Sequence, residues 1–407
     1  MISKNSIGRL PGRSASPGQS VVFTGLAVAF SLLGDMMMYA VIPVHHIALG
    51  LTPLQVGVLL SANRWIRMVT NHLAERITRH LPPLVLVIAA LAGAGATTAV
   101  YGLTTPFLFF LLARLVWGLC WSLLRQIGVM NAVGTAEADK IGRMLGIYNG
   151  VVRIGFVAGT FAGGLFFDSL GYRAGFLLMA GLSLTGIIPA VIGIGRKAKL
   201  VIPKGDGLAR TESRMEDWLT YARGFLIGTV GSGIVMSTLG HVLNERMEGG
   251  LSMGGMVIGV ATINGLLLAV RNTFQIFGSP FLGVLIDKIG VFRSQLLLFS
   301  TATAALLLAF LRIPLGFLVL LVIVFFLSET ALHLGLTVQA GIRGSKRYAY
   351  LATAMDMGSA TGPVVGWTAV GLLLSSRWTF LIGGGFYLLG TLLTLVTMRT
   401  RAVDRVE

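Results

Sequence analysis

Eight ionisable side chains fall within long apolar segments of this sequence, away from the loops and tails that hold most of its charge. Placing such a group inside a membrane costs about 3 kcal/mol on insertion scales, so it must face other protein groups or water. Groups of this kind bind a charged solute, pair with one another or carry a proton. The eight candidates are Asp35, Arg64, Arg67, Arg114, Arg153, Arg271, Glu329 and Asp356.

The spacing of these residues indicates which way they face. Arg64 and Arg67 are three residues apart, which places them on one face of a helix. Arg153 lies about 200° around a helix from Gly155, so the arginine faces elsewhere when the glycine packs against a neighbour. A further arginine, Arg125, is expected to lie near a helix end and to extend its guanidinium to the membrane surface.

A covalent reaction would need a compact set of nucleophile, base or metal ligands, and the sequence offers none. Its six histidines are scattered, and the adjacent His45 and His46 are too few for a metal site. The single cysteine, Cys120, excludes an internal disulfide and a cysteine-based cluster. We therefore expect no enzyme, no metal and no cofactor.

The elements that must position the eight residues are long apolar helices. Of the 407 residues, 55% are hydrophobic and 12% charged, too little charge to cover soluble domains of this size. A helix needs about twenty residues to cross a bilayer. The expected spans are 21–43, 54–74, 83–104, 106–130, 141–167, 173–195, 218–243, 255–285, 292–312, 314–338, 347–374 and 377–398.

The lysines and arginines outside the spans indicate the orientation. With the N-terminus inside, the inner segments hold most of them, whereas the outer turns hold Arg173, Arg246, Arg312 and Arg377. Cytoplasmic loops carry the positive excess, so we expect both termini in the cytoplasm. This distribution accounts for the net charge of +16, and nucleic acid is not an expected partner. The sequence predicts a multi-pass monomer, surrounded by lipid, in the bacterial cytoplasmic (inner) membrane.

A polar interval near the midpoint divides the chain into two sets of six spans, which favours an internal repeat. The expected parts are a cytoplasmic tail (1–20), a six-helix bundle (21–195), a cytoplasmic loop (196–217), a second six-helix bundle (218–398) and a cytoplasmic tail (399–407). Glycines recur every four residues at corresponding places in the two sets, where small residues let helices pack closely. These glycines are Gly155, Gly159 and Gly163 in the fifth span, and Gly358, Gly362 and Gly366 in the eleventh.

Gly283 to Gly290 resembles the loop signature of the major facilitator superfamily, a Gly-x-Leu-x-Asp-Arg/Lys-x-Gly run. The corresponding segment of the first half, from Asn71 to Arg79, keeps the basic positions but has Glu75 in place of the aspartate. The resemblance extends over 21–398. It implies an all-α membrane protein whose twelve transmembrane helices form two pseudo-symmetric bundles around a cavity that opens alternately to each side.

The loop signature also predicts a cytoplasmic gate. A carboxylate beside basic residues can form charged hydrogen bonds to the other half in one conformation and thereby bias the equilibrium between the two openings. We expect this gate to consist of Glu75, Arg76, Arg79, Asp287 and Lys288.

Alignment of the two halves places arginines of the first half opposite carboxylates of the second. Arg153 corresponds to Asp356, and Arg114 lies within one position of Glu329. Each pair is a candidate for an electrostatic bridge that forms and breaks across the cavity, or for a fixed ion pair that holds helices together.

The excess of arginine in the spans favours a small organic solute that is anionic or amphipathic. Protons are the expected coupling ion, with Asp35, Glu329 and Asp356 as candidate carriers. The fifth-span glycines favour proton antiport and export. Uptake by proton symport, a lysolipid flippase and a sensor that does not transport stay open as alternatives.

Overall fold

The computed structural model describes residues 16–136, 140–194, 214–247, 250–253 and 256–403, and nearly all of them are helical. The first half of the chain forms one bundle, the N-terminal bundle. Its helices are α1 (Pro17–His45), α2 (Pro53–His80), α3 (Pro83–Leu103), α4 (Phe107–Thr135), α5 (Ile141–Leu170), α6 (Tyr172–Thr185) and α7 (Ile187–Gly193). Helices α6 and α7 follow one another directly and form one crossing.

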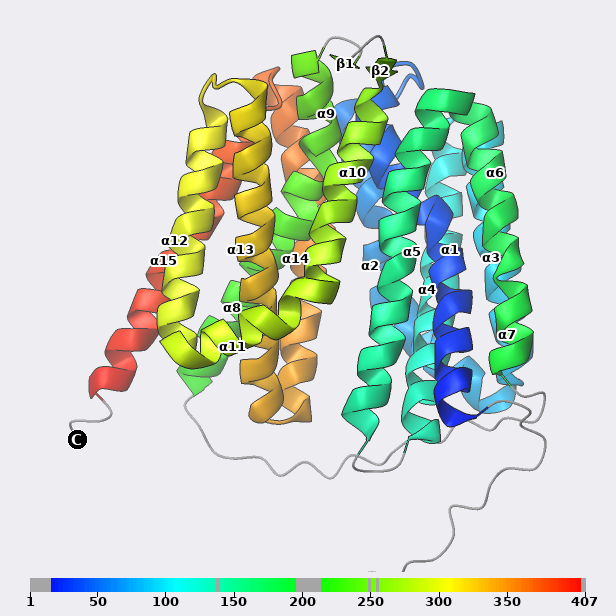
Figure 1. The fold of residues 1–407 in the computed structure, drawn as a ribbon, viewed down its shortest axis with the longest axis horizontal. Helices are drawn as coiled ribbons and strands as arrows, with labels where there is room; N and C mark the ends of the chain where they lie inside the picture. Colours follow the sequence, from blue (N-terminus) through cyan, green and yellow to red (C-terminus); the bar gives the residue numbers. More distant parts are fainter. Residues whose placement is uncertain (1–15, 137–139, 195–213, 248–249, 254–255, 404–407) are drawn as a thin grey trace, which may run out of the picture.

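The second half forms the C-terminal bundle beside the first (Figure 1). It begins with α8 (Arg214–Ile227), the π-helical segment η1 (Gly228–Val235) and α9 (Met236–Met247), which together form one rod. A small antiparallel hairpin of β1 (Leu251–Met253) and β2 (Met256–Ile258) follows. The remaining elements are α10 (Val260–Thr273), η2 (Phe274–Gly278), α11 (Ser279–Ile289), α12 (Val291–Phe310), α13 (Leu315–Ile342), α14 (Ser345–Leu373) and α15 (Trp378–Val403).

These elements make twelve rods, as the sequence predicts, and the fold class is confirmed. Within the described residues, nine of the rods are long and apolar enough to be recognised as membrane spans by composition alone. The other three are α2, the α10–η2–α11 rod and α14, and each of them carries one or more of the charged candidates. These three rods carry four of the eight charged candidates, and the other four lie on rods that are recognised as spans.

The expected first tail falls mostly outside the described residues, as does most of the expected loop 196–217. The described chain begins with a cap: Ser16 accepts a hydrogen bond from the backbone of Gln19, and Pro17 occupies the first helical position. Thr52 and Pro53 repeat this arrangement at the start of α2. The two capping boxes therefore mark the starts of α1 and α2, which lie at opposite ends of the molecule.

The repeating glycines lie in close helix contacts. A Cβ atom on Gly155 would clash with the backbone of Ala29, and one on Gly163 would lie 2.7 Å from Cβ of Met37, so α5 packs directly against α1. In the second half, Gly358 and Gly362 face the backbone of Phe225 and Thr229 in the same way. The two sets of glycines therefore press α5 and α14 against the first rod of their own bundles.

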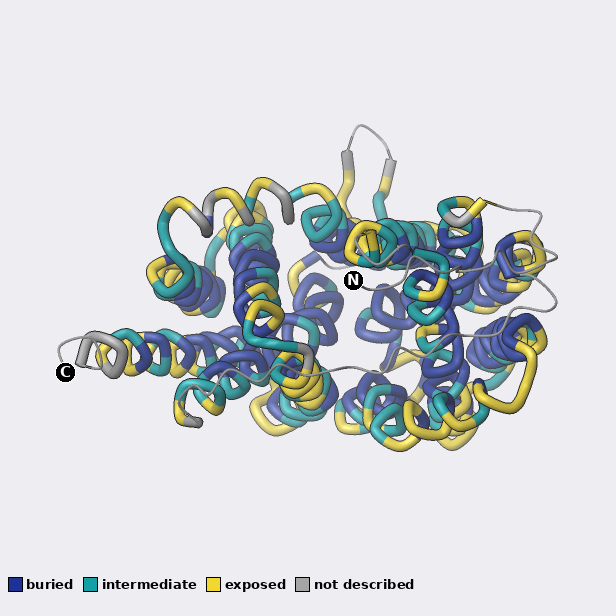
Figure 2. The backbone as a smooth tube through the Cα atoms, turned by 90° about the horizontal axis from the view of Figure 1, so that it is seen from below, coloured by how far each residue is buried: buried dark blue, intermediate teal, exposed yellow. Residues whose placement is uncertain are grey.

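The two ends of the molecule carry different elements. The hairpin end carries β1 and β2, and the terminal end is where α1 begins and α15 ends (Figure 1). The exposed residues lie mainly on the outer faces of the bundles, while the helices between them are largely buried (Figure 2). Large apolar side chains such as Leu108 (60% exposed) and Ile188 (65%) face outward. This surface suits lipid, and the chain is an integral, multi-pass membrane protein.

The bundles meet at the hairpin end. Asn264 of α10 donates to the carbonyls of Tyr39 (3.1 Å) and Ala40 (3.0 Å) on α1, and Asp168 of α5 accepts from the backbone (2.7 Å) and hydroxyl (2.6 Å) of Thr262. Further hydrogen bonds and ion pairs join the bundles midway along the helices. The structure is therefore closed at the hairpin end.

Candidate solute site between the two bundles

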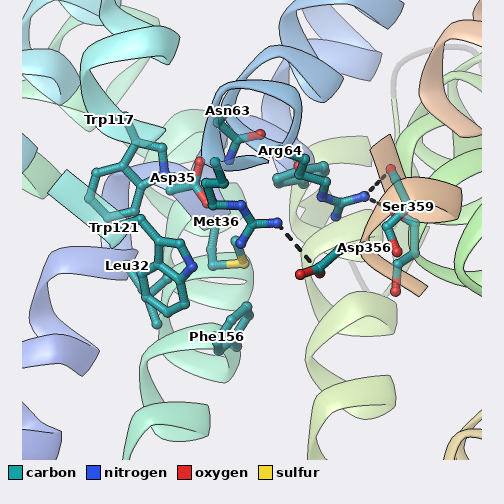
Figure 3. Close-up of a pocket in the computed structure, with 13 residues that line it drawn as sticks. Leu32, Asp35, Met36, Asn63, Arg64, Trp117, Trp121, Phe156, Asp356 and Ser359 are labelled. Atoms are coloured by element: carbon teal, nitrogen blue, oxygen red, sulfur yellow. Dashed lines mark hydrogen bonds and ion pairs between the residues drawn. The ribbon is translucent and has the colours of Figure 1, made fainter. Parts of the chain in front are cut away.

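A cavity of about 150 Å³ lies where the bundles meet in the middle of the molecule. It combines charged groups with large apolar ones, as Figure 3 shows. The N-terminal bundle contributes Leu32, Asp35, Met36, Tyr39, Asn63, Arg64, Arg67, Trp117, Trp121 and Phe156, and the C-terminal bundle contributes Ser232, Asp356 and Ser359. The cavity thus has one aromatic wall and several positive charges.

Asp356 of α14 reaches across to two arginines of the N-terminal bundle. Its carboxylate lies 3.7 Å from Arg67 on α2 and 3.7 Å from Arg125 on α4. The Asp356 side chain is 45% exposed, so water reaches the carboxylate that joins the bundles. The expected end position of Arg125 is wrong, because α4 continues for ten residues beyond it, to Thr135, and its guanidinium lies beside this carboxylate.

Arg64 forms hydrogen bonds with backbone carbonyls of the other bundle and not with a carboxylate. Its guanidinium donates to the carbonyl of Ser232 (2.9 Å) in η1 and to that of Ser359 in α14. The carbonyl of Ser359 is available because its usual helical donor, four residues on, would be Pro363, which has no N–H. Ser232 lies in a π-helical segment, where a change of hydrogen-bond register also leaves backbone groups without their usual partners.

Asp35 and Arg114 form an ion pair inside the N-terminal bundle. The Asp35 side chain is 6% exposed and that of Arg114 is fully buried. Arg114 also donates from Nε to the carbonyl of Leu59 (2.9 Å) and lies over the ring of Tyr39. The sequence-based pairing of Arg114 with Glu329 is therefore wrong in this structure, because a carboxylate of its own bundle is nearer.

Glu329 pairs with Arg271 inside the C-terminal bundle. Two charge-assisted hydrogen bonds of 2.8 and 3.2 Å join their side chains, and Glu329 is 1% exposed. Arg271 also donates to the hydroxyl of Ser232 (2.8 Å), whose carbonyl receives Arg64. The buried pair therefore supports the segment that Arg64 holds.

Arg153 of α5 donates to the side-chain oxygen of Gln275 in η2, on the other bundle. The pairing of Arg153 with Asp356 that the repeat predicted is thus absent here, because Arg67 and Arg125 occupy that carboxylate. With the two internal ion pairs set aside, the eight candidates and Arg125 leave four arginines against one carboxylate at the bundle interface. The bundle interface therefore has a surplus of three positive charges. Of these five residues only Arg64, Arg67 and Asp356 line the cavity, where the surplus is one.

The expected gate residues lie at the terminal end, and the ion pair found among the described ones lies within α2. Arg79 pairs with Glu75 of its own helix, and Arg76 and Lys288 are exposed. The side chain of Asp287 lies outside the described part of the structure. A gate formed by these residues in another conformation stays a prediction.

Sequence reasoning missed Ser232 and Ser359, whose backbone carbonyls receive Arg64. The glycine-rich run from Gly228 to Gly233 and the proline in α14 were the available signals, since both disturb helical hydrogen bonding. No group of three or more His, Cys, Asp or Glu side chains that could hold a metal ion occurs in the described residues.

Comparison with known proteins adds a family. A sequence profile of the Major Facilitator Superfamily matches residues 24–269. The multidrug resistance protein MdtG of Escherichia coli is 24% identical over 358 residues, which cover 82% of this chain and 81% of that protein. An uncharacterised MFS-type transporter of Methanocaldococcus jannaschii is 22% identical over 174 residues, 43% of this chain and 44% of that protein. The chain thus aligns with less than half the length of the archaeal relative.

Solved structures show the same fold at low identity. A bacterial homolog of the human lysosomal transporter Spinster, in an inward-facing and unoccupied conformation, has a TM-score of 0.74 at 15% identity, covering 96% of this chain and 99% of that one. A peptide transporter POT in complex with sulfate has a TM-score of 0.73 at 14% identity, with 96% of each chain covered.

Proposed function

Because this chain belongs to the Major Facilitator Superfamily, we propose that it carries a small amphipathic organic anion across the membrane together with a proton. Family and fold are those of transporters and not of enzymes. We place the protein in a bacterial cytoplasmic membrane with its terminal end inside, as the distribution of its basic loop residues favours.

The observation that supports an anionic solute is the position of Asp356. A carboxylate from one bundle lies 3.7 Å from both Arg67 and Arg125 of the other. It lines the cavity together with Arg64 and Arg67. An arginine fork suits carboxylate, sulfonate and phosphate groups. A solute anion would take the place of the Asp356 carboxylate beside these two arginines.

The same contact supports movement of anion and proton together. Ionised Asp356 competes with the solute for Arg67 and Arg125, whereas protonated Asp356 releases them. Binding of a proton and binding of the anion therefore favour one another. This reciprocity favours symport, one of the alternatives that the sequence left open, over the antiport that the fifth-span glycines suggested. An inward proton gradient would then drive uptake.

The walls of the cavity support a solute with an apolar or aromatic body. Trp117, Trp121 and Phe156 lie on one side of the charged groups. A void of about 150 Å³ has room for a group the size of a benzene ring. These dimensions favour a small solute over a lysolipid. The name of MdtG, a multidrug resistance protein, agrees with an amphipathic cargo.

Two matched probes test this assignment in purified protein. Benzenesulfonate stays anionic across the pH range of interest, and benzyltrimethylammonium has a similar ring but a fixed positive charge. We expect benzenesulfonate to raise the melting temperature, more so at pH 5.5 than at pH 7.5, and benzyltrimethylammonium to leave it unchanged. Stabilisation by the cation alone would contradict the proposal.

The variant Arg67→Gln tests whether benzenesulfonate binds beside Asp356. This change should remove the stabilisation by benzenesulfonate, because it deletes one arm of the cation pair beside Asp356. Arg173→Gln, which removes an exposed arginine at the hairpin end, is the matched control and should respond like the wild type.

A further inference from the structure

A second cavity, of about 420 Å³, opens at the hairpin end of the C-terminal bundle and has no part in the solute site. It lies where the end of α9, the connection from α12 to α13, and the turn from α14 to α15 come together. Its polar lining comprises Glu245, Arg246, Arg312, Ser375, Ser376 and Arg377. Three arginines that the sequence places in outer turns therefore line one cavity.

Two of these arginines, Arg246 and Arg377, have contacts with groups other than carboxylates. Arg377 lies over the rings of Phe310 and Trp378, with 5.5 and 6.0 Å between the guanidinium carbon and the ring centres. Its Nε is buried and has no hydrogen-bond partner. Arg246 donates only weakly to the carbonyl of Ile313 (3.4 Å). Among the described residues, no ion pair joins any of the three to a carboxylate.

The one carboxylate of the cavity is already engaged. Glu245 accepts from the hydroxyl of Ser376 (2.5 Å) and from its backbone N–H (3.3 Å), at the start of α15. Its other contact is with His241, at 3.2 Å. Even with Glu245 counted as fully ionised, the polar lining carries two surplus positive charges.

The rim beside the arginines is apolar and exposed. Leu374 is 89% exposed and Leu372 is 76% exposed. Leu374 has φ of 54°, a left-handed conformation that leucine rarely adopts, and it ends α14 directly before the serines of the cavity. Arginines beside exposed leucines at the end of membrane helices match the boundary between lipid headgroups and acyl chains.

We propose that this cavity binds a phosphate group through Arg246, Arg312 and Arg377. Arginine binds phosphate by two parallel hydrogen bonds, and three guanidiniums with surplus charge match a phosphomonoester or a phosphodiester. The group comes either from a phospholipid of the surrounding leaflet or from free phosphate in solution. The neighbouring leucines favour the lipid, since its chains would cover them.

Purified full-length protein and a short-chain lipid test the site. Binding of dioctanoyl phosphatidylglycerol is measured by fluorescence-detected thermal shift and by native mass spectrometry, with inorganic phosphate as competitor. The variants are Arg312→Gln, Arg377→Gln and the control Arg173→Gln, an exposed arginine at the same end but on the N-terminal bundle. Arg312 is exposed, so its replacement leaves the packing intact if that of Arg377 does not.

We expect Arg312→Gln and Arg377→Gln each to weaken lipid binding about tenfold, the usual effect of losing one charge-assisted hydrogen bond. Arg173→Gln should bind like the wild type. Competition by millimolar inorganic phosphate would identify free phosphate as the ligand, and no competition would identify the lipid headgroup. The proposal is overturned if the wild type binds neither probe, or if all three variants bind alike. Transport plays no part in this assay, so its outcome is independent of the solute site.

Discussion

Asp356 differs from the other two carboxylates of the membrane interior in its access to water. Its side chain is 45% exposed, whereas Asp35 is 6% and Glu329 is 1% exposed. Protonating either buried carboxylate would leave a buried arginine without its partner, which is costly. In the proposed cycle, Asp356 would exchange a proton with solvent while its two arginines bind the solute. Of the three proton carriers that the sequence suggested, Asp356 fits the geometry best.

A charge swap tests the contact between the bundles. Arg67→Asp or Asp356→Arg alone should abolish benzenesulfonate counterflow in proteoliposomes, because each places like charges together. The double variant should recover part of the rate. The corresponding swap of Arg153 with Asp356 should recover nothing, since Arg153 contacts Gln275 instead. Recovery by the second swap and not the first would return the pairing to the one that the repeat predicted.

The pair of Asp35 with Arg114 should contribute to stability rather than to proton coupling. Asp35→Asn leaves the buried Arg114 without a carboxylate, and loss of one partner from a buried ion pair costs about 3–5 kcal/mol. We expect a lower melting temperature in detergent, with partial recovery in the double variant Asp35→Leu with Arg114→Leu. A single variant that melts like the wild type would show that the pair contributes little.

At the scale of elements, the Gly362–Pro363 step gives α14 two properties at once. Gly362 lets the helix approach η1, where a Cβ atom would clash with the carbonyl of Thr229. Pro363 lies inside the helix and leaves the carbonyl of Ser359 open to Arg64. Proline inside a helix costs about 3 kcal/mol. The helix is therefore locally destabilised at the place where Arg64 of the other bundle binds α14.

Pro363→Ala separates these two effects. The variant restores an N–H that competes with Arg64 for the Ser359 carbonyl. We expect a melting temperature at or above that of the wild type, together with slower counterflow. Unchanged transport at higher stability would show that the contact of Arg64 with α14 does not matter for the cycle.

The closed hairpin end contains a buried histidine that links the bundles. His46, after α1, packs edge-on against His241 of α9 and Trp367 of α14, with ring centres 4.9 Å apart in each case. His46 bonds to the carbonyl of Pro43 (3.2 Å), and His241 contacts Glu245. Burial is the main cause that lowers the pKa of His46 to about 4. The nearby His241 and His45 contribute to this lowering, and the hydrogen bond with the Pro43 carbonyl opposes it.

This depressed pKa makes closure of the hairpin end depend on pH. When that end opens, the pKa of His46 returns towards about 6.5, so the open state binds a proton that the closed state rejects. Closure is therefore unaffected above about pH 6.5 and weakens as the pH falls from there towards 4. From pH 7.5 to 5.5 the equilibrium should shift about tenfold towards opening.

Cysteine labelling from the hairpin side measures this shift. In a Cys120→Ser background, Val44→Cys places a thiol at the contact with Gly240 of the other bundle. Ile47→Cys, at a position 72% exposed, corrects for thiol ionisation. The corrected rate at position 44 should rise about tenfold at pH 5.5, and His46→Gln should remove the rise. A pH-independent rate in the wild type would exclude His46 as the cause.

At the scale of the whole molecule, sequence patterns predicted the architecture more reliably than they predicted the contacts between side chains. Twelve apolar segments and paired glycines are local features, and they correctly predicted twelve rods. Partner choice for arginines depends on the register of one helix against another, which no local pattern encodes. The repeat aligned Arg153 with Asp356, whereas in the structure α2 and α4 place Arg67 and Arg125 beside that carboxylate.

The molecule is closed at the hairpin end and open at the terminal end, as expected for one conformation of a carrier's transport cycle. The contacts between the bundles described above lie at the hairpin end and at the level of Asp356, whereas Arg79 of the expected gate pairs with Glu75 of its own helix. Breaking the contacts at the hairpin end and joining Glu75, Arg76 and Arg79 to α11 would reverse the opening. In the cycle that we propose, the carboxylate of Asp356 would respond to both the proton and the anion.

On the proposed function, the anion and the proton move together by way of Asp356. In proteoliposomes, an acidic exterior should drive accumulation of benzenesulfonate inside the vesicles. Asp356→Asn should abolish accumulation but keep counterflow, because Arg67 is then free of its competitor. Accumulation under the opposite pH gradient, or accumulation by Asp356→Asn equal to that of the wild type, would contradict the account.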